Sequence, residues 1–354
     1  HRELKLPEGV DFCSNDSLSL NQDFLPEQLQ RLSPERIGST GSRLIRGHSE
    51  HFRDLEESFA VYAGHEGSLY FSSGYAAALG VGTALFSPRD QVFCDRLLHA
   101  SLLDAVRLSG ARRTYFQHNQ LDDLENQLKA RPKSRHTWIL TETYFSMDGD
   151  SPDLSALLAL ARQYDCLLLL DEAHAIGAMG PAGRGLSAHI RSDVTVTLYP
   201  CGKALGLCGA FVGAHPLILD QLIQKARSFV FSTAPPSIVT LLLQQVIAAL
   251  PGELEERRQK LAANVRYLRS LIAHRADTAR SSGHIVPIIA GTAGRALKLS
   301  AFLFEQGFDV RAIRPPTVPE AQSRLRISLQ SGHAPSELDA LVQALLQALS
   351  SDDL

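Results

Sequence analysis

The sequence predicts an α/β fold with a mainly parallel seven-stranded sheet, followed by a smaller C-terminal α+β domain. Short apolar segments alternate with longer amphipathic segments between about residues 65 and 215, which is the pattern of βαβ units. The length of 354 residues is typical of about two domains. A long amphipathic segment, 253–273, follows Pro251-Gly252, and we place the domain boundary there.

Seven strands are expected in the larger domain, because seven apolar runs have the length of a strand and are too short for a helix. They are Ser68–Phe71, Gln91–Cys94, Thr114–Phe116, Thr137–Thr141, Cys166–Leu170, Val194–Tyr199 and Ala210–Ala214. The expected crossover helices are Tyr75–Leu85, Ala100–Leu108, Leu121–Ala130 and Leu154–Gln163, and another helical run follows Pro235-Pro236. The smaller domain has expected strands at Ile285–Ile289 and Leu325–Leu329, and expected helices near Arg295–Gln306 and Ser336–Leu349. The predicted division is an N-terminal segment, 1–35, a large domain, 36–250, and a small domain, 251–354.

The charge and cysteine content exclude several classes of protein. A net charge of -3 provides no basic surface for nucleic acid or an anionic membrane. The apolar runs are far shorter than the roughly 20 residues that span a bilayer. Five cysteines without a CxxC pair indicate free thiols in a reducing compartment, with neither disulfides nor a zinc site. No secretory signal opens the sequence, so we expect a cytoplasmic protein.

Polar residues follow five of the predicted strands, where ligands bind in open α/β sheets. These positions are Ser72–Tyr75, Asp95–His99, Glu142 with Ser146, Asp171–His174 and Pro200–Lys203. The turn Ser72–Tyr75 precedes a helix, whose first backbone amides can bind a phosphate. Taken alone, this turn is more simply explained as a routine helix N-cap.

Three other kinds of site fit less well. The segment Asp171–His174 would suit a nucleotide-hydrolysing motor, but Ala204 stands where a P-loop around Lys203 requires Ser or Thr. The G-x-S-x-G elbow of serine hydrolases does not occur in the sequence. His48 and His51 could share a helix face, but no third ligand accompanies them, so we expect no metal site.

The five positions together suit pyridoxal 5′-phosphate (PLP), which has a phosphate, a ring nitrogen, a phenolic oxygen and an aldehyde. Asp171 at a strand end can keep the ring nitrogen protonated. Lys203 can attach the aldehyde covalently. His99 and His174 can stack on the ring or bind the phenolic oxygen. Taken alone, Lys203 could be a lysine of a surface loop, His99 a histidine at a helix N-terminus, and Asp171 an N-cap.

The order of these segments resembles the α-oxoamine synthase family of fold-type I PLP enzymes over essentially the whole chain. The segments that carry the resemblance are Ser14–Asp16, Gly38–Ser42, Ser73–Tyr75, His99–Ser101, Ser146–Asp150, Asp171–His174, Gly202–Gly206, Phe231–Thr233, Arg314–Pro319 and Arg324–Arg326. The resemblance implies an enzyme that condenses an amino acid with an acyl thioester. It also implies a homodimer with shared active sites.

The resemblance implies a role for each matching residue. Lys203 would carry the cofactor, Asp171 would pair with the ring nitrogen, and His99 would stack on the ring. The remaining cofactor contacts would come from His174 and Ser146 at the phenolic oxygen, from Ser73, Gly74 and Tyr75 around the phosphate, and from Thr233 at the phosphate of the neighbouring subunit. The substrate contacts would come from Arg326 and Asn15 at the amino-acid carboxylate and from Arg314 and Thr317 at the acyl side.

The segment 313–319 most resembles the branch of the family that condenses L-alanine with a pimeloyl thioester in biotin biosynthesis. Another branch, with a different amino acid and acyl chain, is the nearest alternative. An aminotransferase and a non-catalytic protein on the same fold are the others. Pro200 departs from the family, which usually has a phosphate-binding threonine there, and proline offers neither a hydroxyl nor an amide donor. By the same resemblance, the family's N-terminal helix and its acyl-chain contacts are missing from this sequence, which begins just before Ser14–Asp16.

Overall fold

The computed structural model describes residues 6–34, 37–192, 194–273 and 276–351. The chain divides into two compact units. The larger unit consists of Leu20–Phe145 and Ser151–Glu255, and the smaller consists of the described residues of His1–Ser19, Ser146–Asp150 and Glu256–Leu354. The chain therefore contributes the short segment Ser146–Asp150 to the smaller unit between two segments of the larger one. The division at 35 and 250 that the sequence suggests stays a prediction.

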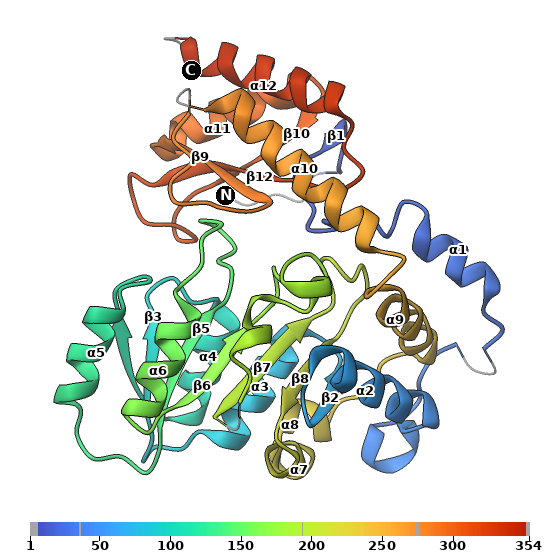
Figure 1. The fold of residues 1–354 in the computed structure, drawn as a ribbon, viewed down its shortest axis with the longest axis vertical. Helices are drawn as coiled ribbons and strands as arrows, with labels where there is room; N and C mark the ends of the chain where they lie inside the picture. Colours follow the sequence, from blue (N-terminus) through green and yellow to red (C-terminus); the bar gives the residue numbers. More distant parts are fainter. Residues whose placement is uncertain (1–5, 35–36, 193, 274–275, 352–354) are drawn as a thin grey trace. The chain divides into compact units, whose positions relative to one another are not determined.

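A seven-stranded sheet forms the centre of the larger unit (Figure 1). Its strands are β2 (Gly67–Phe71), β3 (Gln91–Asp95), β4 (Arg112–Phe116), β5 (Thr137–Glu142), β6 (Leu167–Asp171), β7 (Thr195–Pro200) and β8 (Ala210–Ala214). The strand order is β2-β8-β7-β6-β5-β3-β4. Only β8 runs antiparallel to its neighbours in this sheet. The expected mainly parallel seven-stranded sheet is confirmed.

Helices connect the strands of the larger unit and cover both faces of the sheet. They are α1 (Phe24–Arg31), α2 (Glu50–Ala63), α3 (Gly74–Leu85), α4 (Ala100–Ser109), α5 (Leu121–Ala130), α6 (Leu154–Gln163), α7 (Pro216–Lys225), α8 (Arg227–Val230) and α9 (Ser237–Ala249). Shorter helical turns occur at Arg43–Gly47, Pro181–Gly183 and Leu186–His189. The four expected crossover helices correspond to α3, α4, α5 and α6. Among the described helices of the chain, none combines the length and apolar character that crossing a membrane requires.

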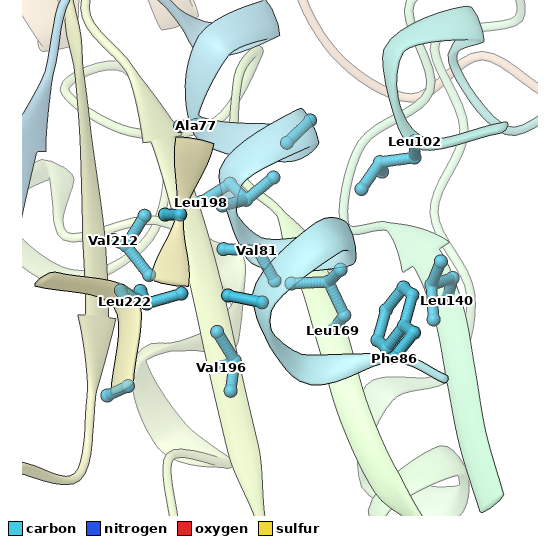
Figure 2. Packing of buried hydrophobic residues seen from close by; sticks show 14 of the residues in the cluster. Ala77, Val81, Phe86, Leu102, Leu140, Leu169, Val196, Leu198, Val212 and Leu222 are labelled. Carbon is cyan, nitrogen blue, oxygen red and sulfur yellow. The ribbon is translucent and has the colours of Figure 1, made fainter. Parts of the chain in front are cut away.

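Two apolar clusters lie on opposite faces of the sheet, because successive side chains of a strand point in opposite directions. Trp138 and Leu140 of β5 pack with α3 and α4, whereas Ile139 between them packs with α5 and α6. Figure 2 shows the first cluster, in which Val81 of α3 faces the strands. Gly82 allows α3 and α4 to pack closely, since a Cβ there would lie 2.6 Å from the Cβ of Ala105.

The smaller unit contains an antiparallel three-stranded sheet of order β11-β12-β9. Its strands are β9 (Ile285–Gly291), β11 (Arg311–Ile313) and β12 (Ser323–Ser328), and its helices are α10 (Glu255–Ile272), α11 (Ala293–Glu305) and α12 (Pro335–Ser350). A two-residue parallel pairing joins β1 (Val10–Asp11) to β10 (Phe308–Asp309). Pairing of segments almost 300 residues apart in sequence brings the start of the described chain into this unit.

A half-buried histidine, His65, lies in the turn between α2 and β2. His65 Nε2 lies 2.8 Å from the hydroxyl of Tyr199, and Arg191 Nε donates to the same hydroxyl at 3.2 Å. The guanidinium of Arg191 thus lies at the hydroxyl that contacts the imidazole, and its positive charge disfavours the protonated form of His65. Burial, together with the charge of Arg191, lowers the pKa of His65 from 6.5 to about 3.

The lowered pKa of His65 predicts that the protein loses stability in acid. Because the folded-state pKa lies below the unfolded value of 6.5, the unfolded chain binds the proton more strongly as the pH falls below 6.5. The wild-type free energy of unfolding should therefore fall more than that of His65→Gln between pH 6.5 and about 4.5. The expected difference is about 2 kcal/mol, measured by urea unfolding at each pH. His189→Gln, at an exposed histidine, should follow the wild type; equal pH dependence of wild type and His65→Gln would contradict the assignment.

Candidate active site

A cavity of about 170 Å³ lies in the larger unit, at the edge where its parallel strands end. The residues that line it are Gly74, Tyr75, His99, Ser101, Glu142, Asp171, Ala173, His174, Pro200 and Lys203. Six of these were predicted from the sequence as site residues: Gly74, Tyr75, His99, Asp171, His174 and Lys203. They come from four separate loops, each following a different strand, as expected for a ligand site at the carboxyl end of an open sheet.

Asp171 is the last residue of β6 and is almost completely buried. It lies in register with Glu142 of β5 and with Leu198 of β7. Its backbone oxygen accepts from the amide of Thr143 at 2.9 Å, and its Oδ1 accepts from the amide of Ala173 at 2.9 Å. These bonds hold the carboxylate at the edge of the cavity. His174, three residues further on, is also buried.

His99 precedes α4 and caps it. Its Nδ1 accepts from the amide of Ser101 at 3.3 Å and lies 2.8 Å from the Ser101 hydroxyl. Since a backbone amide can only donate, Nδ1 is the unprotonated nitrogen, and the neutral ring carries its proton on Nε2. Desolvation lowers the pKa of His99; the charge of Asp171 opposes this shift, and the charge of Lys203 adds to it. The three groups are thus close enough to act on one another electrostatically.

Lys203 lies in the tight connection between β7 and β8. The amide of Gly206 donates to its backbone oxygen at 2.8 Å, and the amide of Cys201 donates to Gly209 at 2.9 Å. Gly177, in the loop after His174, approaches this connection closely. Its φ is +81°, and a Cβ there would lie 3.3 Å from the Cβ of Ala204. The loop after β6 therefore supports the loop that carries the lysine.

Glu172 holds the loop after β6 in place from within the protein. Its side chain is completely buried, and burial raises its pKa although its hydrogen bonds oppose the shift. Oε2 accepts from the amide of Leu186 at 3.1 Å, and Oε1 accepts from the amide of Ser187 at 2.5 Å. The part of the cavity wall that Ala173 and His174 form thus depends on a carboxylate that does not itself line the cavity.

The N-terminus of α3 forms another wall of the cavity. Ser73 caps this helix, because its hydroxyl accepts from the amide of Ala76 at 3.0 Å. Gly74 faces Pro200 so closely that a Cβ there would lie 2.9 Å from the Cγ of the proline. The hydroxyl of Tyr75 donates to the carboxylate of Asp104 on α4. Of the three residues predicted to surround the phosphate, Gly74 and Tyr75 line the cavity, and Ser73 caps the helix that begins there.

The smaller unit brings together three other predicted residues. Arg326 of β12 donates from Nε to the backbone oxygen of Ser146 at 2.6 Å, and from Nη2 to Oδ1 of Asn15 at 2.8 Å. It also donates to the hydroxyl of Ser328 at 2.8 Å. The guanidinium is buried and has a fixed orientation. Arg314 and Thr317 lie in the β11–β12 connection, where the amide of Thr317 donates to the backbone oxygen of Arg314 at 3.1 Å.

The remaining predicted residue, Thr233, lies apart from the cavity. It pairs with Ser42 in an isolated β-bridge and lines a separate small cavity near Arg43. Four lining residues were not among the predicted site residues: Ser101, Glu142, Ala173 and Pro200. Two of them act on predicted residues. Ser101 sets the tautomer of His99, and Glu142 is the strand-end residue beside Asp171. Their positions after a predicted strand and at a predicted helix start are the signals that could have identified them.

The chain matches the family model of aminotransferases of class I and II over residues 7–345. An 8-amino-7-oxononanoate synthase of Alkalilimnicola ehrlichii is 42% identical over 96% of this chain and 88% of its own length. The enzyme of the same name from Nitrosococcus oceani is 39% identical over 98% of this chain and 96% of its own length.

Solved structures show the same fold. A serine palmitoyltransferase from Sphingomonas wittichii has a TM-score of 0.90 at 26% identity, covering 95% of this chain and 86% of its own. An 8-amino-7-oxononanoate synthase from Francisella tularensis has a TM-score of 0.82 at 26% identity, covering 98% of this chain and 99% of its own. The chain therefore belongs to the class I and II aminotransferase family of PLP-dependent enzymes, and within it to the group of 8-amino-7-oxononanoate synthases.

Proposed function

We propose that this enzyme condenses L-alanine with a pimeloyl thioester of coenzyme A or a carrier protein, giving 8-amino-7-oxononanoate for biotin biosynthesis. A bond forms between the alanine Cα and the acyl carbonyl carbon. The C–S bond of the thioester and the bond between Cα and the carboxylate break, so the thiol and carbon dioxide leave. The shared name of relatives that are about 40% identical over nearly the whole chain supports this proposal.

The cavity at the carboxyl end of the sheet is the observation that carries the proposal. It places an amine, Lys203, a buried carboxylate, Asp171, and a neutral imidazole, His99, around one space. These are the groups that a PLP site needs for the aldehyde, the ring nitrogen and the ring face. The residues present therefore fit the cofactor.

Bound PLP supplies a protonated pyridine ring that accepts electrons from the bond that breaks at Cα. Asp171 would accept a hydrogen bond from the ring nitrogen and keep it protonated. Lys203 Nζ would hold the cofactor at its aldehyde carbon and, once the amino acid is bound, would take up the Cα proton. His99 would pack against the ring as a neutral imidazole, while His174 and Ser146 would contact the phenolic oxygen.

The start of α3 binds the phosphate in this proposal, because the first amides of a helix lack intrahelical acceptors. Gly74 and Tyr75 provide these amides, and Ser73 holds the first turn in shape. Pro200 cannot donate a hydrogen bond, but it packs against Gly74 and defines that wall of the cavity. A glycine is thus required at position 74 because of the neighbouring proline.

Arg326 binds the amino-acid carboxylate in this proposal, with Asn15 beside it. Its contacts to Ser146, Asn15 and Ser328 orient the guanidinium before the substrate binds, which reduces the entropic cost of the contact. A bidentate arginine–carboxylate pair then fixes the direction of the Cα–H bond. Arg314 and Thr317 contact the acyl substrate.

A homodimer is part of the same proposal, with Thr233 reaching the phosphate of the neighbouring subunit. Exposed apolar side chains flank the bridge between Ser42 and Thr233. Their exposed fractions are 85% for Ile45, 71% for Phe231 and 50% for Leu44. Large apolar side chains that gather on a surface favour contact with another protein. We also propose a cytoplasmic location, which the five free cysteines support.

A second candidate is a condensation that uses another amino acid and acyl chain. The TM-score of 0.90 to a serine palmitoyltransferase favours this candidate. L-serine with palmitoyl-CoA is then the pair to compare.

We expect the PLP-saturated enzyme to release thiol fastest from pimeloyl-CoA with L-alanine. The comparison pairs are glycine with acetyl-CoA, glycine with succinyl-CoA and L-serine with palmitoyl-CoA, each followed with a thiol reagent. Preference for another pair would keep the condensing chemistry and overturn the proposed substrates. Conversion of PLP to pyridoxamine phosphate by an amino acid alone would indicate an aminotransferase.

Replacing Gly74 by alanine should weaken PLP binding. The new Cβ would lie 2.9 Å from the Cγ of Pro200, and such overpacking costs about 1–3 kcal/mol. We expect the Kd for PLP to rise by roughly tenfold, measured by titrating cofactor-free protein. Gly294→Ala, where no atom lies within 4 Å of the new Cβ, is the matched control. An unchanged Kd in Gly74→Ala would contradict the assigned phosphate wall.

A further inference from the structure

The turn between β3 and α4 contains a buried carboxylate that the proposed reaction does not use. Asp95 ends β3 and is completely buried. Its Oδ1 accepts from the amide of Leu97 at 2.8 Å, and its Oδ2 accepts from the amide of Asn119 at 3.0 Å. Its backbone oxygen accepts from the amide of Leu98 at 3.1 Å. One residue therefore shapes most of the path from the strand to His99.

His118 joins this turn from the loop after β4. Its Nδ1 lies 2.9 Å from Oδ1 of Asp95. Because an ionised carboxylate can only accept, Nδ1 of His118 carries the proton in this bond. A buried charge of this kind is expensive unless it is paired and hydrogen-bonded. His118 therefore keeps the Asp95 carboxylate in the position that the turn requires.

His118 also contacts a second loop at the same edge of the sheet. Its ring meets that of Phe145 edge-on, with centroids 4.4 Å apart and an interplanar angle of 85°. Phe145 is buried and follows Glu142, which lines the cavity, by three residues. His118 thus connects the loop that leads to His99 with the loop that follows β5. Neither His118 nor Asp95 is among the described residues that line the cavity.

We infer that Asp95 and His118 form a positioning pair that holds the imidazole of His99 in the cavity. The inference rests on the proposed function in one respect, namely that His99 packs against the cofactor. The ring of His99 is oriented locally by Ser101. The place of its backbone, however, depends on the four-residue turn that Asp95 closes. Loss of the pair would leave the α4 cap intact and release the turn that carries it.

The test compares the pKa of His99 in variants of His118, measured by NMR on histidine-labelled protein without PLP. His118→Phe keeps an aromatic ring against Phe145 and removes the donor to Asp95. His118→Asn keeps a donor near the place of Nδ1. His136→Phe is the matched control. His136 precedes β5, and its Nδ1 lies 3.9 Å from another buried carboxylate, that of Asp90.

We expect the pKa of His99 to rise towards its ordinary value in His118→Phe. The ring would then move away from the protein atoms that desolvate it and from Lys203, which both lower the pKa, and from Asp171, which raises it. His118→Asn and His136→Phe should keep the wild-type pKa. With PLP and substrates, kcat of His118→Phe should be about tenfold or more below that of the wild type, as expected for a displaced group in a site. The kcat of His118→Asn should remain close to the wild-type value.

An unchanged His99 pKa in His118→Phe, accompanied by a lower free energy of unfolding, would overturn the inference and leave the pair a purely stabilising role. Equal shifts in His118→Phe and His136→Phe would also overturn it. If His118→Phe does not fold, Asp95→Asn provides the same comparison, since it keeps one oxygen acceptor and removes the charge. The measurement needs neither cofactor nor substrate, so its outcome is independent of whether the proposed reaction is correct.

Discussion

The register of the parallel strands β5, β6 and β7 is the constraint on which the candidate active site depends. It places Asp171 beside Glu142 and Leu198, at the end of a strand whose last four residues are buried. A slip of one residue would point every side chain of the strand to the opposite face. The amides of Thr143 and Ala173 then bind Asp171 directly. The carboxylate is therefore fixed by the fold before any ligand binds, which is the condition for electrostatic preorganisation.

Beside this carboxylate the protein favours the neutral form of His99. Desolvation lowers the pKa of His99, and Ser101 selects the tautomer with Nδ1 as acceptor. A neutral imidazole can pack against a ring whose nitrogen is protonated, whereas an imidazolium would repel it. The same principle operates at a distance from the site, where burial and the charge of Arg191 lower the pKa of His65. Supporting groups such as Glu172 and Asp95 remain outside the cavity and act through backbone amides.

Most strands and crossover helices could be predicted from the sequence, because their apolar periodicity matches the two faces of one sheet. The expected helices Leu121–Ala130 and Leu154–Gln163 agree with α5 and α6 residue for residue. Helices α2 and α7 were not predicted. The six cavity residues could be identified because parallel strands end at one edge. The hydrogen-bond partners of Arg326 could not be identified from the sequence, since its bond to Asn15 joins residues 311 positions apart. The contact between Asp95 and His118 likewise forms because β3 and β4 pair side by side in the sheet. The apolar pattern of one strand does not show which strand lies beside it.

We propose that the cavity at the carboxyl end of the sheet holds PLP on Lys203. Borohydride reduction of the PLP-loaded protein, followed by proteolysis and mass spectrometry, is a direct test because reduction makes the link to the cofactor permanent. We expect a phosphopyridoxyl group on Lys203, and its loss in Lys203→Ala. A modification on a different lysine, or an adduct of equal yield in Lys203→Ala, would contradict it.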